Sequence, residues 1–214
     1  MSDYPKTPRN QVKRVPKRGH YDRETIFGIL DAGFLAHVGF VINDQPFVIP
    51  TAYGREGEII YLHGASKSRM LLNVKKGIPV CLTVTIIDGL VLARSSFHHS
   101  MNYRSAVIFG EAYEVLKDDK RHALQVISEN ILKGRWEEAR KPNQKELEAT
   151  TVLALKIDQA SAKIRTGPPV DEKSDYDTPI WAGVLPMEVR TLNPVPDPEL
   201  NENIPFPASV NQFL

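Results

Sequence analysis

The chain has 214 residues, 42% of them hydrophobic, which is enough to bury one sizeable core. Its 27 Lys and Arg residues balance 26 Asp and Glu residues, and the net charge of +1 gives no reason to expect nucleic acid as a partner. No apolar run reaches the roughly 20 residues that span a bilayer, and the N-terminus lacks a signal peptide's apolar stretch. We therefore expect a cytoplasmic protein with no membrane partner.

Residues 1–19 are basic and contain several prolines, so we expect an N-terminal arm with little fold of its own unless a partner orders it. A helix follows, with Asp22 as candidate N-cap and an apolar face at Ile26, Phe27, Ile29 and Leu30. Segments 34–42, 46–54 and 58–64 are rich in β-branched and aromatic residues and are separated by short polar turns. They predict three successive antiparallel strands.

The middle of the chain predicts a second helix and then further strands. Residues 66–76 form a helical pattern that Gly77 ends, and segments 79–88, 90–97 and 103–116 predict three strands. After a helix that begins near residue 118 and a shorter one near Lys145, the segments TVLALKI and SAKIRTG complete the sheet. The pattern predicts a small β-barrel with peripheral helices, which forms one domain over residues 20–187.

Residues 188–214 form a proline-rich C-terminal tail that cannot pair as a strand, so we expect extended chain. Phe206 and Phe213 would anchor this tail on a partner subunit, and the alternative is a mobile tail. The lone Cys81 excludes an internal disulfide. Adjacent His98 and His99 would point in different directions in an extended chain, so we expect no metal site.

An anion site is predicted in LHGASKSRM, residues 62–70. A strand ends at a glycine there, and a helix begins among Ser66, Lys67, Ser68 and Arg69, so hydroxyls, cations and backbone N–H groups could meet a phosphate. The alternative is an ordinary helix start with a solvated face. The sequence has neither GxGxxG nor GxxxxGK[ST]. The motifs that usually indicate a dinucleotide-binding fold or a nucleoside-triphosphate-binding fold are therefore absent from it.

Five segments carry a resemblance to a known family: FVIPTAYG, IIYLHGASKSRM, VCLTVTIIDGLVLARS, RSAVIFGEA and IWAGVLP. In this order they resemble the flavin-binding split β-barrels of the pyridoxamine 5′-phosphate oxidase superfamily, in particular the branch of the nitroimidazole reductases. The resemblance runs roughly from Gly19 to Met187. It implies a mainly β protein with some α, a six- to seven-stranded antiparallel split β-barrel with peripheral helices.

The resemblance also implies FMN at a homodimer interface, with FAD and haem as alternative cofactors. By position, the phosphate and flavin contacts fall on His63, Lys67, Ser68 and Arg69. Pro50, Thr51, Ala52 and Tyr53 match the strand whose backbone lies along the flavin ring. Ser105 stands where the oxidases use a glutamine to contact that ring, and Trp181 is similar to a family tryptophan close to the flavin.

The stretch SFHHSMNYR, residues 96–104, places polar side chains ahead of a strand. Given the resemblance, we expect Ser96, His98, His99, Asn102, Tyr103 and Arg104 to form the polar rim of the cofactor pocket. The alternative is a solvated hairpin loop. His63 is the candidate for the active histidine of the nitroimidazole-reductase branch, with His37 as the fallback, whereas a histidine in an apolar strand is otherwise a hydrogen-bonded structural residue.

The function implied is an FMN-dependent oxidoreductase that uses NAD(P)H to reduce a small electrophile such as a nitro compound. Small-molecule electron donors and acceptors would be its substrates. Pyridoxamine phosphate is not expected, because the residues between Trp181 and Arg190 do not match the oxidase motif. The alternatives are a non-catalytic flavin- or haem-binding storage protein of the same fold and a structural module with an empty barrel.

Overall fold

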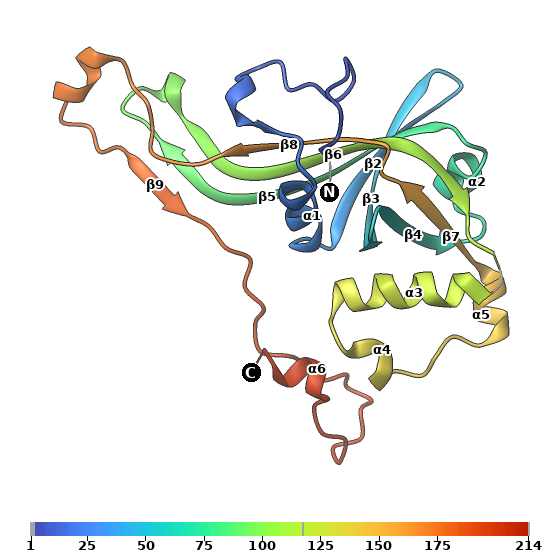
Figure 1. The fold of residues 1–214 in the computed structure, drawn as a ribbon. Helices are drawn as coiled ribbons and strands as arrows, with labels where there is room; N and C mark the ends of the chain where they lie inside the picture. The colour runs from blue at the N-terminus through green and yellow to red at the C-terminus, as the bar shows by residue number, and fades with distance from the viewer. Residues whose placement is uncertain (1–2, 117, 214) are drawn as a thin grey trace.

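The computed structural model describes residues 3–116 and 118–213, so the outermost residues of the two terminal segments lie outside it. A six-stranded antiparallel barrel forms its centre (Figure 1). The barrel strands follow one another around the ring in the order β6 (Ser100–Glu114), β7 (Thr150–Lys156), β4 (Ile59–Ala65), β3 (Gln45–Glu56), β2 (Leu35–Ile42) and β5 (Pro79–Leu92). Pairing of β5 with both β2 and β6 closes the ring, as expected for a split β-barrel.

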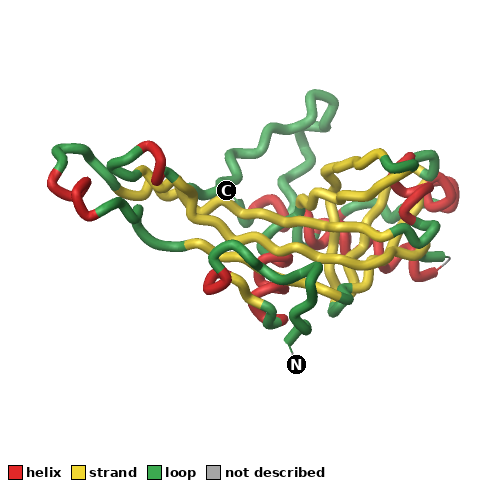
Figure 2. The backbone as a smooth tube through the Cα atoms, turned by 90° about the horizontal axis from the view of Figure 1, so that it is seen from above, coloured by secondary structure: helices red, strands yellow, loops and turns green. Residues whose placement is uncertain are grey.

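Strands β5 and β6 extend beyond the barrel as a long hairpin, which we call the arm (Figures 1 and 2). Three shorter strands add to its edges: β8 (Gln159–Arg165) and β1 (Gly19–His20) beside β6, and β9 (Gly183–Pro186) beside β5. Short 3₁₀ helices lie at the chain connections: η1 (Pro16–Arg18), η2 (Ser96–His98) and η3 (Lys173–Asp177).

The prediction of two separate strands at 79–88 and 90–97 is wrong. A single strand, β5, continues to Leu92, with a register irregularity between Ile87 and Gly89. Asp88 occupies the irregularity, and both its carboxylate oxygens accept hydrogen bonds from Arg104 on β6, at 2.7 to 3.2 Å. A β-bulge held by an ion pair therefore lies where the prediction ended the first of the two strands.

The core lies inside the barrel and under helix α1 (Arg23–Asp31). The side chain of Asp22 accepts a hydrogen bond of 2.8 Å from the backbone N–H of Thr25, which confirms the predicted N-cap. Ile26 and Leu30 on α1 are fully buried in one cluster with the inward residues of the strands. Each such side chain contributes roughly 1.5–3 kcal/mol by leaving water, so this cluster fixes α1 on the barrel.

The remaining helices lie around the barrel: α2 (Arg69–Val74), α3 (Asp118–Ile131), α4 (Arg135–Glu138), α5 (Gln144–Ala149) and α6 (Ala208–Asn211). Helix α3 covers the outer face of β3 and β4 (Figure 1). It comes so close at Gly54 that a Cβ there would lie 2.6 Å from the carbonyl oxygen of Val126. Asn130 also donates hydrogen bonds to the carbonyl oxygens of Gly33 and Tyr53, at 3.1 and 2.9 Å. This close packing covers the outer face of β3 at Gly54, whereas Val48 and Pro50 on the same face stay exposed.

The N-terminal segment is better ordered on the fold than its composition predicts. Tyr4 is buried in the main core cluster, and Asn10 is also buried. The side-chain amide of Asn10 donates to the carbonyl oxygens of Pro5 and Ala160, at 2.9 and 3.0 Å. The expectation of an arm with little fold of its own missed these anchors, because a single tyrosine and asparagine in a basic segment give no periodic pattern.

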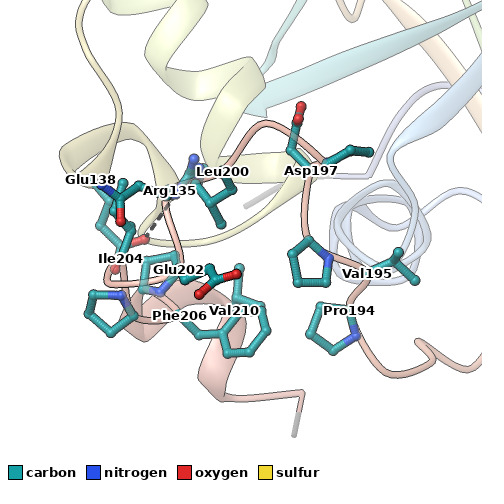
Figure 3. A pocket seen from close by; sticks show the side chains of 15 residues that line it. Arg135, Glu138, Pro194, Val195, Asp197, Leu200, Glu202, Ile204, Phe206 and Val210 are labelled. Carbon is teal, nitrogen blue, oxygen red and sulfur yellow. Dashed lines mark ion pairs between the residues drawn. The ribbon is translucent and has the colours of Figure 1, made fainter.

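The C-terminal segment runs as extended chain from the arm to helix α4, where Ser209 donates a backbone hydrogen bond of 3.0 Å to Glu138 (Figure 1). Between these two attachments Val189 and Val195 are more than 90% exposed. Figure 3 shows the pocket that its proline-rich loop forms against Arg135 and Glu138. The lining residues of that pocket belong to the tail and α4 alone. In the part of the chain that the structure describes, no helix has the length and apolarity needed to cross a membrane.

Candidate cofactor site

One face of the barrel presents a row of outward side chains to solvent, which we call the outer wall. Strand alternation places Val38, Val84 and Ala106 in the core and their neighbours on the opposite face. The strand register then aligns the outer-wall residues from β3 through β2 and β5 to β6: Pro50, Ala52, Leu35, His37, Thr83, Thr85 and Ser105. The outer wall is thus a continuous surface built by four strands.

The outer wall combines apolar area with a few polar groups. His37 stands directly opposite Pro50 on one neighbouring strand and Thr83 on the other. Leu35 is 47% exposed, and Thr85 donates a hydrogen bond of 3.2 Å to the hydroxyl of Ser105. Such a surface, in which apolar side chains lie beside hydroxyl and imidazole groups, suits a planar aromatic ligand.

Of the predicted contacts on β3, two lie on the outer wall and two do not. Pro50 and Ala52 face outward, whereas Thr51 and Tyr53 alternate to the inner side. Tyr53 is fully buried, and its hydroxyl donates to the carbonyl oxygen of Leu30 at 2.5 Å. This side chain holds α1 on the barrel, so only the backbone of Tyr53 is available along the outer wall. Whether Thr51 and Tyr53 contact a cofactor stays a prediction.

The predicted anion segment lies beside β3. Ser68 is the N-cap of α2 and makes no side-chain capping hydrogen bond, so its hydroxyl is free of the helix. Lys67 and Arg69 are exposed, and neither makes an ion pair with any residue the structure describes. The guanidinium of Arg69 lies over the ring of Phe47 on β3, 4.3 Å from its centroid. Phe47 stands opposite the buried Phe40 and packs against the core, so Arg69 lies at an end of the barrel, beside β3, rather than on the outer wall itself.

His63 lies on β4, the strand that neighbours β3 on the side opposite to β2. Its neighbour Leu62 is fully buried, so the imidazole faces outward, one step beyond the point where Tyr53 and Leu62 pair. The Nδ1 atom of His63 is buried and has no hydrogen-bond partner among the described residues. Burial lowers the pKa of His63 below its ordinary value, so the ring stays neutral near pH 7. A buried ring nitrogen without a partner can accept or donate a hydrogen bond to a ligand.

The polar stretch 96–104 is engaged mostly within its own chain. Arg104 binds Asp88, and the amide of Asn102 lies between Arg165 and the carbonyl oxygen of Gly167. Nδ1 of His99 accepts a hydrogen bond of 3.0 Å from the backbone N–H of Ala93. The two contacts of Asn102 tie the arm to residues 165–167. Tyr103 keeps an outward position on β6, on the same face as Ser105, so the structure brings one of the six residues proposed for the rim toward the edge of the outer wall.

Trp181 lies on the arm, 64% exposed, and its ring carbons come within 3.0 Å of the position that a Cβ on Gly183 would occupy. Figure 1 places the arm and helix α2 at opposite ends of the molecule. One chain therefore does not bring Trp181 together with Arg69. Outward residues that the sequence reasoning missed are Thr83, Thr85 and Lys163, and strand register is the signal that places them.

The residues present fit a flavin on this surface. The outer wall offers a flat area, Arg69 offers a guanidinium without a carboxylate partner in the described chain, and His63 offers a buried nitrogen that lacks a partner. A ligand with an aromatic ring system and a phosphate has a group that matches each of these features.

Comparison with solved structures finds the same fold in other proteins. The chain is 41% identical to the flavocytochrome Anf3 from Azotobacter vinelandii, with a TM-score of 0.90 and 97% of each chain covered. It is 36% identical to the FAD and haem binding protein from Mycobacterium smegmatis, with a TM-score of 0.88, covering 92% of this chain and 97% of that one. A 5-nitroimidazole antibiotic resistance protein from Bacteroides thetaiotaomicron, 24% identical with a TM-score of 0.57, shares the fold over 68% of this chain and 86% of that one.

A curated relative matches over a short stretch. The chain is 30% identical over 88 residues, 40% of its length, to the 1-phosphatidylinositol 4,5-bisphosphate phosphodiesterase zeta-1 of Homo sapiens, and it spans only 14% of that protein. The family profile described as pyridoxamine 5′-phosphate oxidase matches residues 22–164, more than half of the chain. The protein therefore belongs to the pyridoxamine 5′-phosphate oxidase family, as its split barrel and the five sequence segments predict.

Proposed function

We propose that this protein is a flavin-binding redox protein whose flavin ring lies on the outer wall. The proposal is carried by three features of the described chain taken together. These are the flat outer face, the guanidinium of Arg69 over Phe47, and the buried Nδ1 of His63 without a partner in the described chain. The similarity to a flavocytochrome over nearly the whole chain supports it.

The chain's own residues would bind and orient the flavin. Arg69 and Ser68 would hold a phosphate, the guanidinium by two parallel hydrogen bonds. Thr85 and Ser105, which already bond to each other, would present hydroxyls to the polar edge of the ring system. His63 would hold a hydrogen bond through Nδ1, and its lowered pKa keeps that nitrogen neutral. When bound, a flavin supplies the hydride and electron transfer chemistry.

The residues of the outer wall would suit the ring system of FMN and that of FAD equally. The sequence predicts FMN, whereas the solved relative from Mycobacterium smegmatis is described as binding FAD and haem. Arg69 and Ser68 would hold a phosphate of either cofactor. We therefore propose a flavin in general and expect FAD to be the tighter ligand, because that relative shares 36% of its residues over 92% of this chain. Haem is the second cofactor that both relatives suggest.

We also propose a homodimer that completes each flavin site. The outer face carries exposed apolar side chains on β2 and β3, with Leu35 at 47%, Val41 at 53% and Val48 at 64% exposed. Apolar residues in such a contiguous group favour burial against another protein surface. A two-fold partner would supply its arm, which within one chain lies at the opposite end of the molecule from helix α2.

Flavin binding is tested by titrating FMN and FAD into flavin-free protein while flavin fluorescence is followed. Ser105→Trp fills the outer wall with a bulky side chain, and Ser174→Trp adds the same group at an exposed position of η3. We expect the Ser105 variant to lose flavin and the Ser174 variant to keep the affinity of the unmodified protein. Equally tight flavin binding by the unmodified protein and both variants would show that the flavin does not lie on the outer wall.

Reduction of a small electrophile such as a nitro compound, with NAD(P)H as electron donor, is the proposed activity. The proposed alternative is a protein that stores flavin or haem without turnover. The similarity to a relative described as a binding protein supports this alternative. Anaerobic addition of NADH and NADPH to the flavin-loaded protein separates the two. Rapid bleaching of the visible flavin band supports a reductase, and a flavin inert to both donors supports the binding protein. The cytoplasm is the compartment we propose for either activity.

A further inference from the structure

The N-terminal segment carries a concentration of positive charge that the flavin site does not use. Residues 1–20 contain six of the chain's 27 Lys and Arg residues and one of its 26 Asp and Glu residues. The rest of the chain therefore holds 21 cations against 25 anions, a net charge of −4. In residues 3–116 and 118–213, none of the six N-terminal cations makes an ion pair. We call these six residues the basic face: Lys6, Arg9, Lys13, Arg14, Lys17 and Arg18.

The loop that carries four of these cations, residues 13–18, is closed at its base. The side chain of Val12 packs against Gly19 of β1, where a Cβ would lie 2.9 Å from the Cβ of Val12. The backbone N–H of Val12 also donates a hydrogen bond of 2.9 Å to the hydroxyl of Tyr21. Inside the loop, Val15 has a φ of 53°, which a β-branched residue adopts only where its surroundings fix it. A loop of defined shape therefore presents these cations to solvent.

The other two cations of the basic face lie on aromatic rings. Nζ of Lys6 is 4.8 Å from the centroid of the Tyr21 ring, and the guanidinium carbon of Arg9 is 5.9 Å from that of Phe109. Phe109 lies on β6, four residues after Ser105, and strand alternation puts both side chains on one face. At about 3.3 Å per residue, the two are roughly 13 Å apart along the strand. The basic face therefore borders the outer wall on its β6 side.

An uncompensated group of cations attracts an anionic partner, and the surroundings of the basic face indicate its class. Among residues 3–20, Tyr4 is buried and Val12 and Val15 are half-buried, so no apolar or aromatic side chain of these types is exposed. A membrane-binding surface needs exposed apolar side chains, and single-stranded nucleic acid needs exposed rings on which bases stack. A long duplex would also meet the rest of the molecule, whose net charge is −4. A small acidic protein would meet the basic face alone.

We propose that the basic face docks a small acidic electron-transfer protein beside the flavin. The inference rests on the proposed function, because the outer wall that the basic face borders is the proposed place of the flavin ring. Electron-transfer complexes have small interfaces, below about 1,200 Å², and complementary charge steers their encounter. The partner would be an electron donor in addition to NAD(P)H. Each encounter would oxidise the partner's redox centre by one electron, and two encounters with two protons from solvent would reduce one flavin.

Titration of the protein with two acidic probes, a plant-type ferredoxin and a flavodoxin, tests the docking by calorimetry. Lys13→Glu combined with Arg14→Glu reverses two charges of the basic face, whereas Lys133→Glu combined with Lys145→Glu reverses two exposed charges elsewhere. At an ionic strength of about 10 mM, where charges act over about 30 Å, we expect the first double variant to bind roughly tenfold or more weakly. The control should stay within about twofold of the unmodified protein, and about 1 M salt should abolish the difference.

Electron transfer is followed separately, by mixing reduced ferredoxin or flavodoxin with the flavin-loaded protein in a stopped-flow spectrometer. The rate of flavin bleaching should fall with rising salt in the unmodified protein and should be roughly tenfold or more lower in the Lys13→Glu, Arg14→Glu variant. Bleaching by NADPH, measured relative to the control double variant, should be the same in both. This split would separate docking of the protein partner from any general effect on the flavin.

Four results would overturn the inference. Equal binding of the probes by both double variants would show that the basic face is not the docking surface. Absence of binding of either probe to the unmodified protein at low salt would exclude a partner of this class. Tighter binding of duplex DNA or of phosphatidylserine vesicles than of either probe would assign the basic face to nucleic acid or to a membrane. Docking without electron transfer to a bound flavin would remove the redox role. Because the calorimetric titration also works with flavin-free protein, failure of the proposed flavin site alone leaves the docking test intact.

Discussion

The guanidinium carbon of Arg69 lies 4.3 Å from the centroid of the Phe47 ring, so the first turn of α2 is in contact with strand β3. Stacking on this ring, which faces the core side of β3, holds the guanidinium at an end of the barrel without using its hydrogen-bond donors. Lys67, two residues earlier, is exposed and makes no such contact in the described chain. The two cations of the anion segment are therefore not equivalent.

Arg69→Ala should weaken flavin binding more than Lys67→Ala does. A lost charge-assisted contact to phosphate costs roughly 1.5–3 kcal/mol, or about ten- to a hundredfold in dissociation constant. Titration of each variant with FMN and with FAD measures this difference, and Lys67→Ala serves as the matched loss of one charge. Unchanged flavin affinity in Arg69→Ala would take this residue out of the site.

The stability of the protein should depend on pH through His63. Burial lowers the pKa of His63 in the folded state, so the unfolded chain binds the proton more tightly. Unfolding is therefore favoured progressively as the pH falls below the ordinary histidine pKa of about 6.5. We expect the melting temperature to drop between pH 7.5 and pH 5, roughly, and to drop less in His63→Gln. The same pH dependence in both proteins would assign it to other groups.

Flavin and the dimer should stabilise each other. If both chains contact the flavin, flavin favours the dimer by the same free energy with which the dimer favours flavin. Removing flavin should lower the melting temperature, and the loss should grow as the protein is diluted. Thermal unfolding at several concentrations, with and without flavin, measures the linkage. A flavin-saturated monomer in light scattering at micromolar concentration would contradict the shared site.

Asn10→Ala should destabilise the protein although Asn10 lies in a basic terminal segment. The substitution leaves the buried carbonyl oxygen of Ala160 without its donor, and such losses cost roughly 1–3 kcal/mol. Gln11→Ala, at an exposed neighbouring position, is the control and should change stability by less than about 0.5 kcal/mol. Denaturant unfolding compares the two. Equal stability of both variants would mean that this segment is not held on the sheet in solution.

Two glycines should respond to alanine in opposite directions. Gly28 lies on the exposed side of α1, and a Cβ there meets no atom within 4 Å, so Gly28→Ala should stabilise by roughly 0.5–1 kcal/mol. Gly54→Ala would place a Cβ 2.6 Å from the backbone of α3 and should destabilise by roughly 1–3 kcal/mol. Urea unfolding of both variants checks the sign. A stabilising Gly54→Ala would show that α3 is not packed against β3 as closely as the structure has it.

The sequence predicts the barrel well because strand and helix patterns are local. The alternation in 34–42 and 46–54 and the N-cap Asp22 appear as β2, β3 and α1. It does not predict how long β5 is, because Asp88 and Gly89 resemble a turn until Arg104, on another strand, pairs with Asp88. Nor does it predict the burial of Tyr4 and Asn10, which depends on contacts with strands far along the chain.

The site was predictable only where a short motif holds its residues together. Lys67, Ser68 and Arg69 are adjacent, and one stretch of chain is enough to propose them as a group. The outward placement of Thr85 and Lys163 instead depends on the register of three strands, β5, β6 and β8, that one sequence does not fix. The same register separates Tyr53, which faces the core, from Ala52 beside it.

The absorption spectrum of the freshly purified protein, followed by titration of any colourless fraction with FMN and FAD, tests the central claim most directly. The flavin site on the outer wall predicts visible flavin bands, or their appearance with quenched flavin fluorescence on titration. A Soret band beside them would add the haem. A colourless protein that takes up neither FMN nor FAD, while folded by circular dichroism, would contradict the flavin site.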